Sequence, residues 1–335
     1  MKWLSDETLT RLQASVQCPD LSSTRYRALK FVARGGMGAV WLAEDVVLHR
    51  RVALKVLDVE DRTGELASRL EREALVLAHL EHPGIVPVHD AGTLPDGRVF
   101  YCMKYVEGQT LESYIVNTNL PQRLGLAQRI AEPLAFAHSK GIVHRDLKPG
   151  NIMIGAFGEV LIMDWGLAKI TNSTIQESSH ITSAGTPGEQ TGFATAAPIT
   201  SHGKILGTPG YMSPEQARGD SAAMDERSDI FSLGAILRFM LTGQSPEETP
   251  TTAPLPKPLN AICQKAMAPE ISERYASIQE MSADISQYLE GVPISAYREG
   301  IVERGMRLLE RHRVAVVLVL AYIAMRVLFI LFSHR

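Results

Sequence analysis

Three oxygen-bearing side chains near the middle of the chain have the types that metal chemistry needs. They are Asp146, Asn151 and Asp164. Two apolar runs, Ile152–Ile154 and Val160–Met163, lie on either side of a turn that contains glycine, and this pattern predicts a short β-hairpin. Such a hairpin would deliver the three side chains to one place. Because Mg²⁺ prefers hard oxygen ligands and keeps phosphates and waters as its other partners, the stretch predicts a site for a magnesium-bound nucleotide.

The same stretch carries a longer pattern. The run His144–Asn151 (HRDLKPGN) matches the catalytic loop of protein kinases, and Asp164–Gly166 resembles their Asp-Phe-Gly element with Trp165 in place of Phe. Lys148, two positions after the Asp, is typical of serine/threonine kinases. The chain therefore resembles the bacterial Hanks-type (eukaryotic-like) serine/threonine protein kinases. That resemblance implies an α+β, bilobal protein kinase fold with a small antiparallel β lobe and a larger helical lobe.

The resemblance also implies roles for these residues. Asp146 would position the substrate hydroxyl and accept its proton, and Lys148 would neutralise charge on the transferring γ-phosphoryl group. Asn151 and Asp164 would hold the metal of bound ATP, which is expected to be Mg²⁺ with Mn²⁺ as the alternative. Trp165 is larger than Phe, so it needs a roomier pocket if Asp164 is to keep its position.

A glycine-rich turn lies between strands predicted at Tyr26–Val32 and Val40–Ala43. Glycines in such a turn let backbone N–H groups approach phosphates closely. The turn resembles the glycine-rich loop of kinases, except that alanine stands at the first glycine position. The residues that this resemblance places against the nucleotide are Val32, Ala33, Arg34, Gly35, Gly36, Met37, Gly38, Ala39 and Val40.

Two charged residues of the expected small lobe complete the phosphate site. Lys55 ends the predicted strand Val52–Lys55, and the resemblance has it reach the α- and β-phosphates. Leucines on one face predict a helix over residues 65–80. Glu73 on this helix resembles the glutamate that pairs with the strand lysine, whereas Glu71 points elsewhere on the helix.

The strand predicted at Val99–Val106 is expected to end in the hinge between the lobes. Met103 would narrow the back of the adenine pocket, and backbone groups around Tyr105 would bind the adenine edge. Val40, Ala53 and Met153 would pack on the adenine faces. The same three side chains could equally be core residues. In a kinase a residue can be part of the core and also contact adenine, because the bound adenine completes the core.

The expected large lobe is helical. Helices are predicted over residues 122–139, 259–267 and 277–290. Pro133 deletes one backbone hydrogen bond and crowds the preceding turn, at a cost of about 3 kcal/mol unless the helix bends. A kink or an irregular turn is therefore predicted near Arg129–Pro133.

The expected activation segment, residues 164–215, is long and rich in Ser and Thr. It is either a disordered spacer or a segment activated by autophosphorylation, and Arg145 favours the second because it could pair with a phosphate there. The stretch from Gly207, with Thr208, resembles the substrate-docking loop, which disfavours a small-molecule substrate. Three residues carry structural expectations: Glu215 should pair with Arg274, and Asp229 should accept backbone N–H groups from the catalytic loop.

Composition restricts the remaining possibilities. The chain has 335 residues, a net charge of −3 and three widely separated cysteines, so nothing suggests a nucleic-acid partner, a zinc site or a disulfide framework. The expected organisation is an N-terminal extension (1–24), a kinase domain (25–290, with lobes at about 25–106 and 107–290), a basic juxtamembrane segment (291–313) and a transmembrane helix (314–332).

The expected anchor, residues 314–332, is apolar apart from Arg326. Its aliphatic and Phe residues favour insertion by roughly 6 kcal/mol, against about 3 kcal/mol for the arginine. Arginines before it place the kinase on the cytoplasmic side of the cell membrane in a single-pass arrangement. The alternative is a helix that packs on the kinase domain.

The sequence thus predicts a serine/threonine protein kinase that transfers the γ-phosphoryl group of Mg-ATP to Ser and Thr hydroxyls of proteins. A homodimer would allow autophosphorylation in trans, and the sequence leaves dimerisation open. The alternative is a catalytically weak pseudokinase, a membrane-anchored nucleotide-binding scaffold. Only Ala33 and Trp165 favour that alternative.

Overall fold

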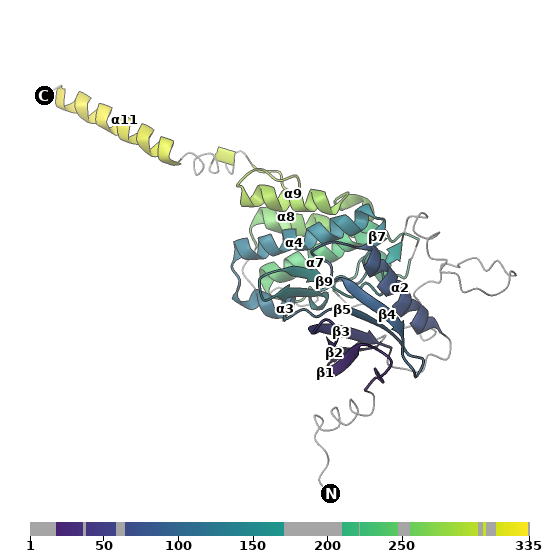
Figure 1. Cartoon of the computed structure of the whole chain (residues 1–335). Helices are drawn as coiled ribbons and strands as arrows, with labels where there is room; N and C mark the ends of the chain where they lie inside the picture. Colours follow the sequence, from purple (N-terminus) through teal and green to yellow (C-terminus); the bar gives the residue numbers. More distant parts are fainter. Residues whose placement is uncertain are drawn as a thin grey trace, which may run out of the picture.

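The computed structural model describes residues 18–35, 38–57, 64–170, 210–220, 222–246, 255–300, 304–305 and 313–333. Within them the chain forms a lobe built on a β-sheet, followed by a larger lobe built mainly of helices (Figure 1). The bilobal α+β fold implied by the kinase resemblance is confirmed.

The small lobe is an antiparallel sheet of five strands in the order β1-β2-β3-β5-β4. Its elements are β1 (Tyr26–Arg34), β2 (Ala39–Asp45), β3 (Arg50–Val56), α2 (Glu65–His79), β4 (Val88–Thr93) and β5 (Val99–Lys104). Alternate residues of β2 are buried, as expected for a strand with one face in a core. Helix α2 packs against β4 and β5, so a residue on its inner face can reach the middle of the sheet.

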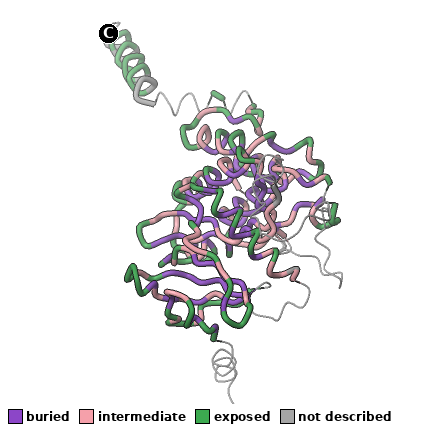
Figure 2. Tube along the Cα trace, turned by 45° about the vertical axis from the view of Figure 1, so that its right-hand side comes forward, coloured by how far each residue is buried: buried purple, intermediate pink, exposed green. Residues whose placement is uncertain are grey.

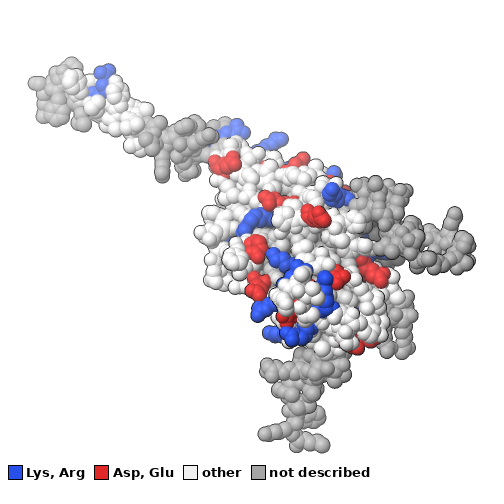
Figure 3. Space-filling model, viewed as in Figure 1, with Lys and Arg blue, Asp and Glu red and all other residues white. Residues whose placement is uncertain are grey.

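Charged side chains of both signs are intermixed on the small-lobe surface seen in Figure 3. Arg27 pairs with Glu44, and Arg51 donates to Glu107 over 2.9 Å. Because both members of the second pair are more than half exposed, this pair contributes little to stability.

The large lobe begins after β5. Its elements are β6 (Gly108–Thr110), α3 (Leu111–Tyr114), the 3-10 turn η1 (Ile115–Asn117), α4 (Leu120–Ser139), β7 (Ile142–Val143), η2 (Pro149–Asn151), β8 (Ile152–Gly155), β9 (Val160–Ile162), β10 (Lys169–Ile170), α6 (Pro214–Ala217), α7 (Glu226–Thr242), α8 (Lys257–Ala266), η4 (Ile271–Glu273) and α9 (Ile278–Leu289). Strands β8 and β9 form the predicted hairpin, β8 also pairs with β6, and β7 pairs with β10. The core of this lobe surrounds α7, which contacts α4, α8 and α9 and is buried along most of its length. Figure 2 shows buried residues in the interior of the domain and exposed residues at its margins.

Of the kink or irregular turn predicted near Arg129–Pro133, the irregular turn does not form, and the kink stays a prediction. Helix α4 is helical without interruption from Leu120 to Ser139, and Pro133 is buried inside it. Gly84 makes room for the proline ring, because a Cβ atom at Gly84 would lie 2.9 Å from Pro133 Cγ. Tertiary packing therefore outweighs the local cost of the missing hydrogen bond.

The predicted C-terminal helix forms as α11 (Arg313–Ser333). Its exposed apolar side chains are Val317, Leu318, Val319, Tyr322, Ile323, Met325, Phe329 and Ile330. Among the described residues, however, no helix combines the length and the apolarity that crossing a membrane requires. The transmembrane span expected at 314–332 is therefore not confirmed.

Candidate active site

Three charged residues from separate elements meet at one ammonium group. Lys55 Nζ, on β3, donates to Glu73 Oε1 (2.8 Å) and Oε2 (2.9 Å) on α2, and to Asp164 Oδ1 (2.9 Å) just after β9. Tyr101 on β5 donates its hydroxyl to Glu73 Oε1 over 2.8 Å. Lys55 and Glu73 are buried, whereas the Asp164 side chain is 41% exposed. The cluster thus joins a strand, a helix and the end of the β8–β9 hairpin.

Electrostatics keep the ammonium of this cluster charged. Burial opposes the charge of Lys55, but the carboxylates of Glu73 and Asp164 outweigh it and raise the pKa of the ammonium group. Burial alone would raise the pKa of Asp164. The positive charge of Lys55 and its hydrogen bond have the larger, opposite effect, so the pKa lies below its usual value. Burial also raises the pKa of Glu73, although Lys55 counteracts it. Asp164 is therefore the carboxylate best kept ionised for a cation.

The predicted catalytic loop brings its three polar side chains together. Lys148 Nζ donates to Asp146 Oδ2 over 2.8 Å. Asn151 Nδ2 donates to the backbone oxygen of Asp146 over 2.8 Å and to its Oδ2 over 3.1 Å. Oδ2 of Asp146 therefore accepts hydrogen bonds from both Lys148 and Asn151, whereas Oδ1 accepts none from these two residues.

A buried carboxylate holds the backbone of this loop, as predicted. Asp229 in the first turn of α7 accepts the N–H of Arg145 (2.9 Å) and that of His144 (2.8 Å). Its Oδ2 also lies 2.8 Å from Nε2 of His138 on α4. Burial raises the pKa of Asp229, but the hydrogen bonds and the histidines outweigh it, so the pKa is lowered. Asp229 is therefore a structural anion.

Two residues of the site have positive φ angles, which are uncommon outside glycine. They are Arg145 (φ 68°) and Asp164 (φ 60°). Such backbone conformations cost of order 1–3 kcal/mol and persist where the surroundings hold them. Arg145 donates its N–H to Asp229, and Asp164 accepts a hydrogen bond from Lys55. The strain lies at the two positions that orient the expected base and the expected metal ligand.

Trp165 fits without displacing Asp164. Its ring is 1% exposed and packs on the His144 ring, with 4.6 Å between centroids. Leu77 of α2 belongs to the same apolar core. The roomier pocket that a tryptophan requires is therefore present. The indole Nε1 is buried and makes no hydrogen bond within the described residues.

The glycine-rich turn is closed by a hydrogen bond from Gly35 N to Gly38 O (2.8 Å). A Cβ atom at Gly38 would lie 2.3 Å from the backbone oxygen of Val56, so only glycine fits there. Ala33 pairs with Val40 in the β1–β2 ladder and does not have positive φ, which explains why alanine is tolerated. Gly36 and Met37 lie outside the described residues, as does Thr208.

The residues expected around adenine come from both lobes, with Ala53 and Met103 on the small-lobe sheet and Met153 on β8. Ala53 on β3 is opposite Met103 on β5. Met103 and Met153 pack on one small cluster formed by Val86, Val106 and Leu161. Tyr105 follows β5 and is half-buried. The apolar surroundings agree with the expectation, while the nucleotide contacts themselves stay predictions.

The donor set also fits a hard divalent cation. Met163 N donates to the backbone oxygen of Asn151 over 2.9 Å, which places Asn151 beside the residue that precedes Asp164. The Asn151 amide nitrogen is used for Asp146, which leaves its oxygen as a ligand atom. Lys55 occupies Asp164 Oδ1, which leaves Oδ2. Two protein oxygens would leave most of the six positions around Mg²⁺ for phosphate and water, which are its usual other ligands.

Some residues of this network were not predicted from the sequence. From the sequence alone, Tyr101 is an ordinary residue of a strand and His138 an ordinary histidine near the end of a helix. Gln216 was not singled out, although its side chain donates to the backbone oxygen of Arg145 over 2.6 Å. The pairing of Glu215 with Arg274 was predicted and is present, with contacts of 2.7 and 2.8 Å.

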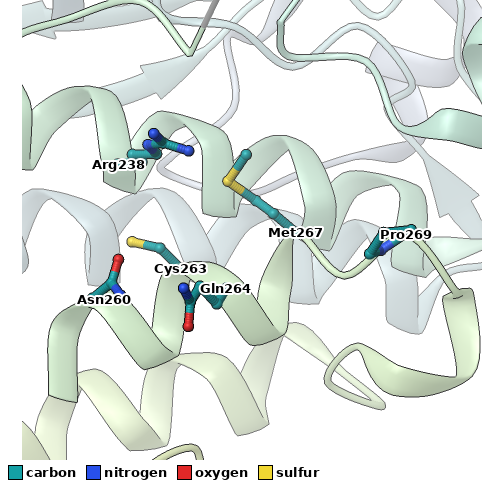
Figure 4. A pocket seen from close by; sticks show the side chains of 6 residues that line it. All are labelled: Arg238, Asn260, Cys263, Gln264, Met267 and Pro269. Atoms are coloured by element: carbon teal, nitrogen blue, oxygen red, sulfur yellow. The ribbon is translucent and has the colours of Figure 1, made fainter. Parts of the chain in front are cut away.

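A cavity of about 450 Å³ lies apart from these residues, between α7 and α8 (Figure 4). Its lining residues are Arg238, Asn260, Cys263, Gln264, Met267 and Pro269. None of them belongs to the predicted site. Burial raises the pKa of the Cys263 thiol to about 12, which favours the neutral thiol over the thiolate.

The fold and the site together define a kinase. The profile of the protein kinase domain family matches residues 26–292, so the chain belongs to the protein kinase family. The curated relatives that it matches are named serine/threonine-protein kinases and come from bacteria.

Individual relatives support this placement. The chain is 37% identical over 302 residues to serine/threonine-protein kinase PknD of Chlamydia felis, covering 80% of this chain and 31% of that protein. It is 35% identical over 309 residues to PknD of Protochlamydia amoebophila, covering 81% and 30%. The chain thus spans about a third of the length of these relatives. Its fold is similar to the kinase domain of Mycobacterium tuberculosis PknI, with a TM-score of 0.57, 24% identity, and 80% of this chain and 97% of that chain covered.

Proposed function

We propose that this chain is an active serine/threonine protein kinase that transfers the γ-phosphoryl group of ATP to protein hydroxyls. The observation that carries the proposal is the double contact of Lys55 with Glu73 and Asp164. This contact is the arrangement that phosphoryl transfer needs, because the lysine and the metal-binding carboxylate must both be in place. A pseudokinase would not need to maintain it.

The residues of the chain then act in named roles. Asp146 accepts the proton of the substrate hydroxyl through the carboxylate oxygen that Lys148 and Asn151 leave available. Lys148 stays close to the transferred group and offsets its negative charge. Lys55 orients the phosphates, and Asn151 and Asp164 hold the metal, for which we propose Mg²⁺ with Mn²⁺ as the alternative. Bound metal-ATP supplies the phosphoryl group and a cation that neutralises charge on it.

The nucleotide contacts are part of the same proposal. The residues that we assign to them are Val32–Val40, Ala53, Lys55, Met103, Tyr105 and Met153. The close approach of Gly38 to β3 supports the assignment, because it keeps the glycine-rich turn over the strand that carries Lys55.

The test is incubation of the purified chain with γ-labelled ATP and Mg²⁺, in parallel with Asp146→Asn. We expect label on Ser or Thr in the parent and a loss of at least about 100-fold in the variant, since general-base catalysis contributes about 10²–10⁴-fold. ATP binding should persist in both. Nucleotide binding without any label in the parent would instead favour the scaffold.

Activation by autophosphorylation in trans is a further part of the proposal. Mixing the parent with full-length Asp146→Asn chain tests it, because the variant can accept phosphate but not transfer it. Label on the variant in the mixture would support trans transfer between two copies. Label restricted to the parent would exclude it.

We also propose that residues 314–332 attach the kinase to the cell membrane, with the kinase domain in the cytoplasm. The exposed apolar side chains of α11 support this proposal. Deleting 314–335 should move the protein from the membrane fraction to the soluble fraction. An alkaline carbonate wash of the parent separates the two modes of attachment, because a spanning helix resists extraction and a surface-bound helix does not. Unchanged distribution after the deletion would contradict the proposal.

A further inference from the structure

Gln216 connects two parts of the molecule that are far apart in sequence. It occupies the third position of α6, the short helix that follows Ser213. Its amide nitrogen donates to the backbone oxygen of Arg145 over 2.6 Å. Its amide oxygen accepts the N–H and the hydroxyl of Ser213, each over 3.0 Å. One side chain thus joins the start of α6 to the catalytic loop.

The orientation of the Gln216 amide follows from its partners. Both groups of Ser213 donate, so the oxygen of the amide must face Ser213 and its nitrogen must face Arg145. Ser213 is fully buried. Glu215, the residue before Gln216, is held by Arg274 at 2.7 Å and by the hydroxyl of Ser228 at 2.8 Å. Helix α6 is therefore a firm support from which the amide reaches the loop.

The carbonyl that Gln216 holds belongs to the peptide unit immediately before the expected base, Asp146. The N–H of that same unit donates to Nδ1 of His144 over 3.2 Å. The preceding N–H, that of Arg145, donates to Asp229 over 2.9 Å. Since Arg145 has a φ of 68°, this backbone needs external contacts to stay in place. Gln216 is the contact that fixes the carbonyl end of the unit.

We infer that Gln216 is a positioning residue for Asp146, acting through the Arg145–Asp146 peptide. It links the end of the segment that precedes α6 to the orientation of the base. This inference rests on the proposed kinase function. Gln216 itself would touch neither ATP nor the substrate hydroxyl, so its removal should affect the rate of transfer more than nucleotide binding.

The variant Gln216→Glu tests this inference with little change in shape. It keeps an oxygen for Ser213, and glutamate is a favoured residue at this position of a helix start, so α6 should remain formed. It replaces the donor to Arg145 with an acceptor, which repels the carbonyl. Gln122→Glu is the matched control, because Gln122 has the same position in the start of α4, accepts from Asn119 N over 2.9 Å and is exposed.

We expect Gln216→Glu to lower kcat by about 10- to 100-fold, since small misplacements of a catalytic group can cost about 100-fold. The KM and the Kd for ATP should change by less than about twofold. Gln122→Glu should keep kcat within about twofold of the parent. Parental kcat in Gln216→Glu, or an equal loss of ATP binding, would overturn the inference while leaving the proposed function intact.

A second measurement does not depend on activity. Amide hydrogen exchange of peptides that cover residues 142–151 should become faster in Gln216→Glu and stay unchanged in Gln122→Glu, because one support of the loop backbone is lost. Unchanged exchange in Gln216→Glu would overturn the inference even if the parent transferred no phosphate. Absence of transfer in the parent, with faster exchange in the variant, would contradict only the proposed function.

Discussion

Lys55 carries its charge in a buried position, where an isolated ammonium group would lose its proton. Glu73 and Asp164 make the charged form the stable one, and Tyr101 satisfies a carboxylate oxygen of Glu73. Removing one partner of a buried ion pair is costly because the remaining charge is left without compensation. Replacing Lys55 should therefore both stop phosphoryl transfer and destabilise the small lobe.

We expect Lys55→Met to abolish phosphoryl transfer and to lower the free energy of unfolding by about 3–5 kcal/mol. Arg51→Met is the control on the same strand, since Arg51 forms an exposed pair with Glu107. Its cost should be no more than about 1 kcal/mol. Denaturant unfolding followed by circular dichroism measures both changes. Equal costs for the two variants would contradict the role given to the buried cluster.

Glu215 makes a second buried pair, with Arg274, and both side chains are fully buried. Burial raises the pKa of Glu215, but the hydrogen bonds from Arg274 and its other donors outweigh it, so the pKa falls from 4.5 to about 2. The folded chain thus releases this proton more readily than the unfolded chain. The resulting stability is complete above about pH 4.5 and is lost as the pH falls toward 2.

The pair should be visible in the pH dependence of stability. The pKa difference of Glu215, from 4.5 to about 2, corresponds to about 3 kcal/mol. We expect Glu215→Gln to be less stable than the parent at pH 7, and this difference to shrink between pH 5 and pH 3. Glu107→Gln, at an exposed pair, should differ little from the parent throughout. A difference for Glu215→Gln that stays constant with pH would exclude this assignment.

At the scale of elements, the β1–β2 hairpin can lie close to β3 because Gly38 has no side chain. Gly38 lies so close to β3 that a Cβ atom would meet backbone atoms of Val56. A backbone neighbour cannot rotate away as a side chain can. Gly35 differs, because the nearest atom to its Cβ would be Gly38 O at 3.9 Å.

Gly38→Ala should therefore push the hairpin away from β3 and destabilise the small lobe by about 1–3 kcal/mol. Gly35→Ala should change the unfolding free energy by less than about 0.5 kcal/mol in the absence of nucleotide. Thermal unfolding without ATP compares the two variants directly. If both behaved like the parent, the close packing at Gly38 would not be present in solution.

At the scale of the whole molecule, contacts of Lys55 with Asp164 join the sheet of the small lobe to the hairpin of the large lobe. A ligand that binds only the folded state adds stability by mass action, about 2.7 kcal/mol at 100 times its Kd. Metal-bound ATP should therefore stabilise the whole kinase domain.

We expect Mg-ATP to raise the unfolding temperature of the chain by about 5 °C. The part of this shift that depends on Mg²⁺ should vanish in Asp164→Asn, which removes the proposed metal ligand. Asp96→Asn is the control, because Asp96 is an exposed carboxylate that pairs with Arg98. In Asp164→Asn we expect ATP to raise the unfolding temperature by the same amount with and without a chelator of Mg²⁺. A rise that still depends on Mg²⁺ in this variant would argue against Asp164 as a metal ligand.

The sequence by itself determined the elements and most of the polar set. The hairpin of β8 and β9, the α2 helix and the pairing of Lys55 with Glu73 were all predicted from spacing and from the kinase resemblance. This succeeded because local patterns fix which side chains share a strand or a helix face, and because the catalytic loop presents its polar residues in one short run. The Glu215–Arg274 pair joins residues far apart in the chain, and it was predicted from the kinase resemblance alone.

Only the tertiary structure decided the rest. Pro133 was expected to cause a kink or an irregular turn, but α4 is helical without interruption, and Gly84 makes room for the proline ring. No local rule contains that contact. Tyr101 and Gln216 act through partners that are distant in the chain, so their sequence neighbourhoods give no signal. Hydrogen bonds between distant segments depend on where a whole lobe places its backbone, and that placement is a property of the packed core.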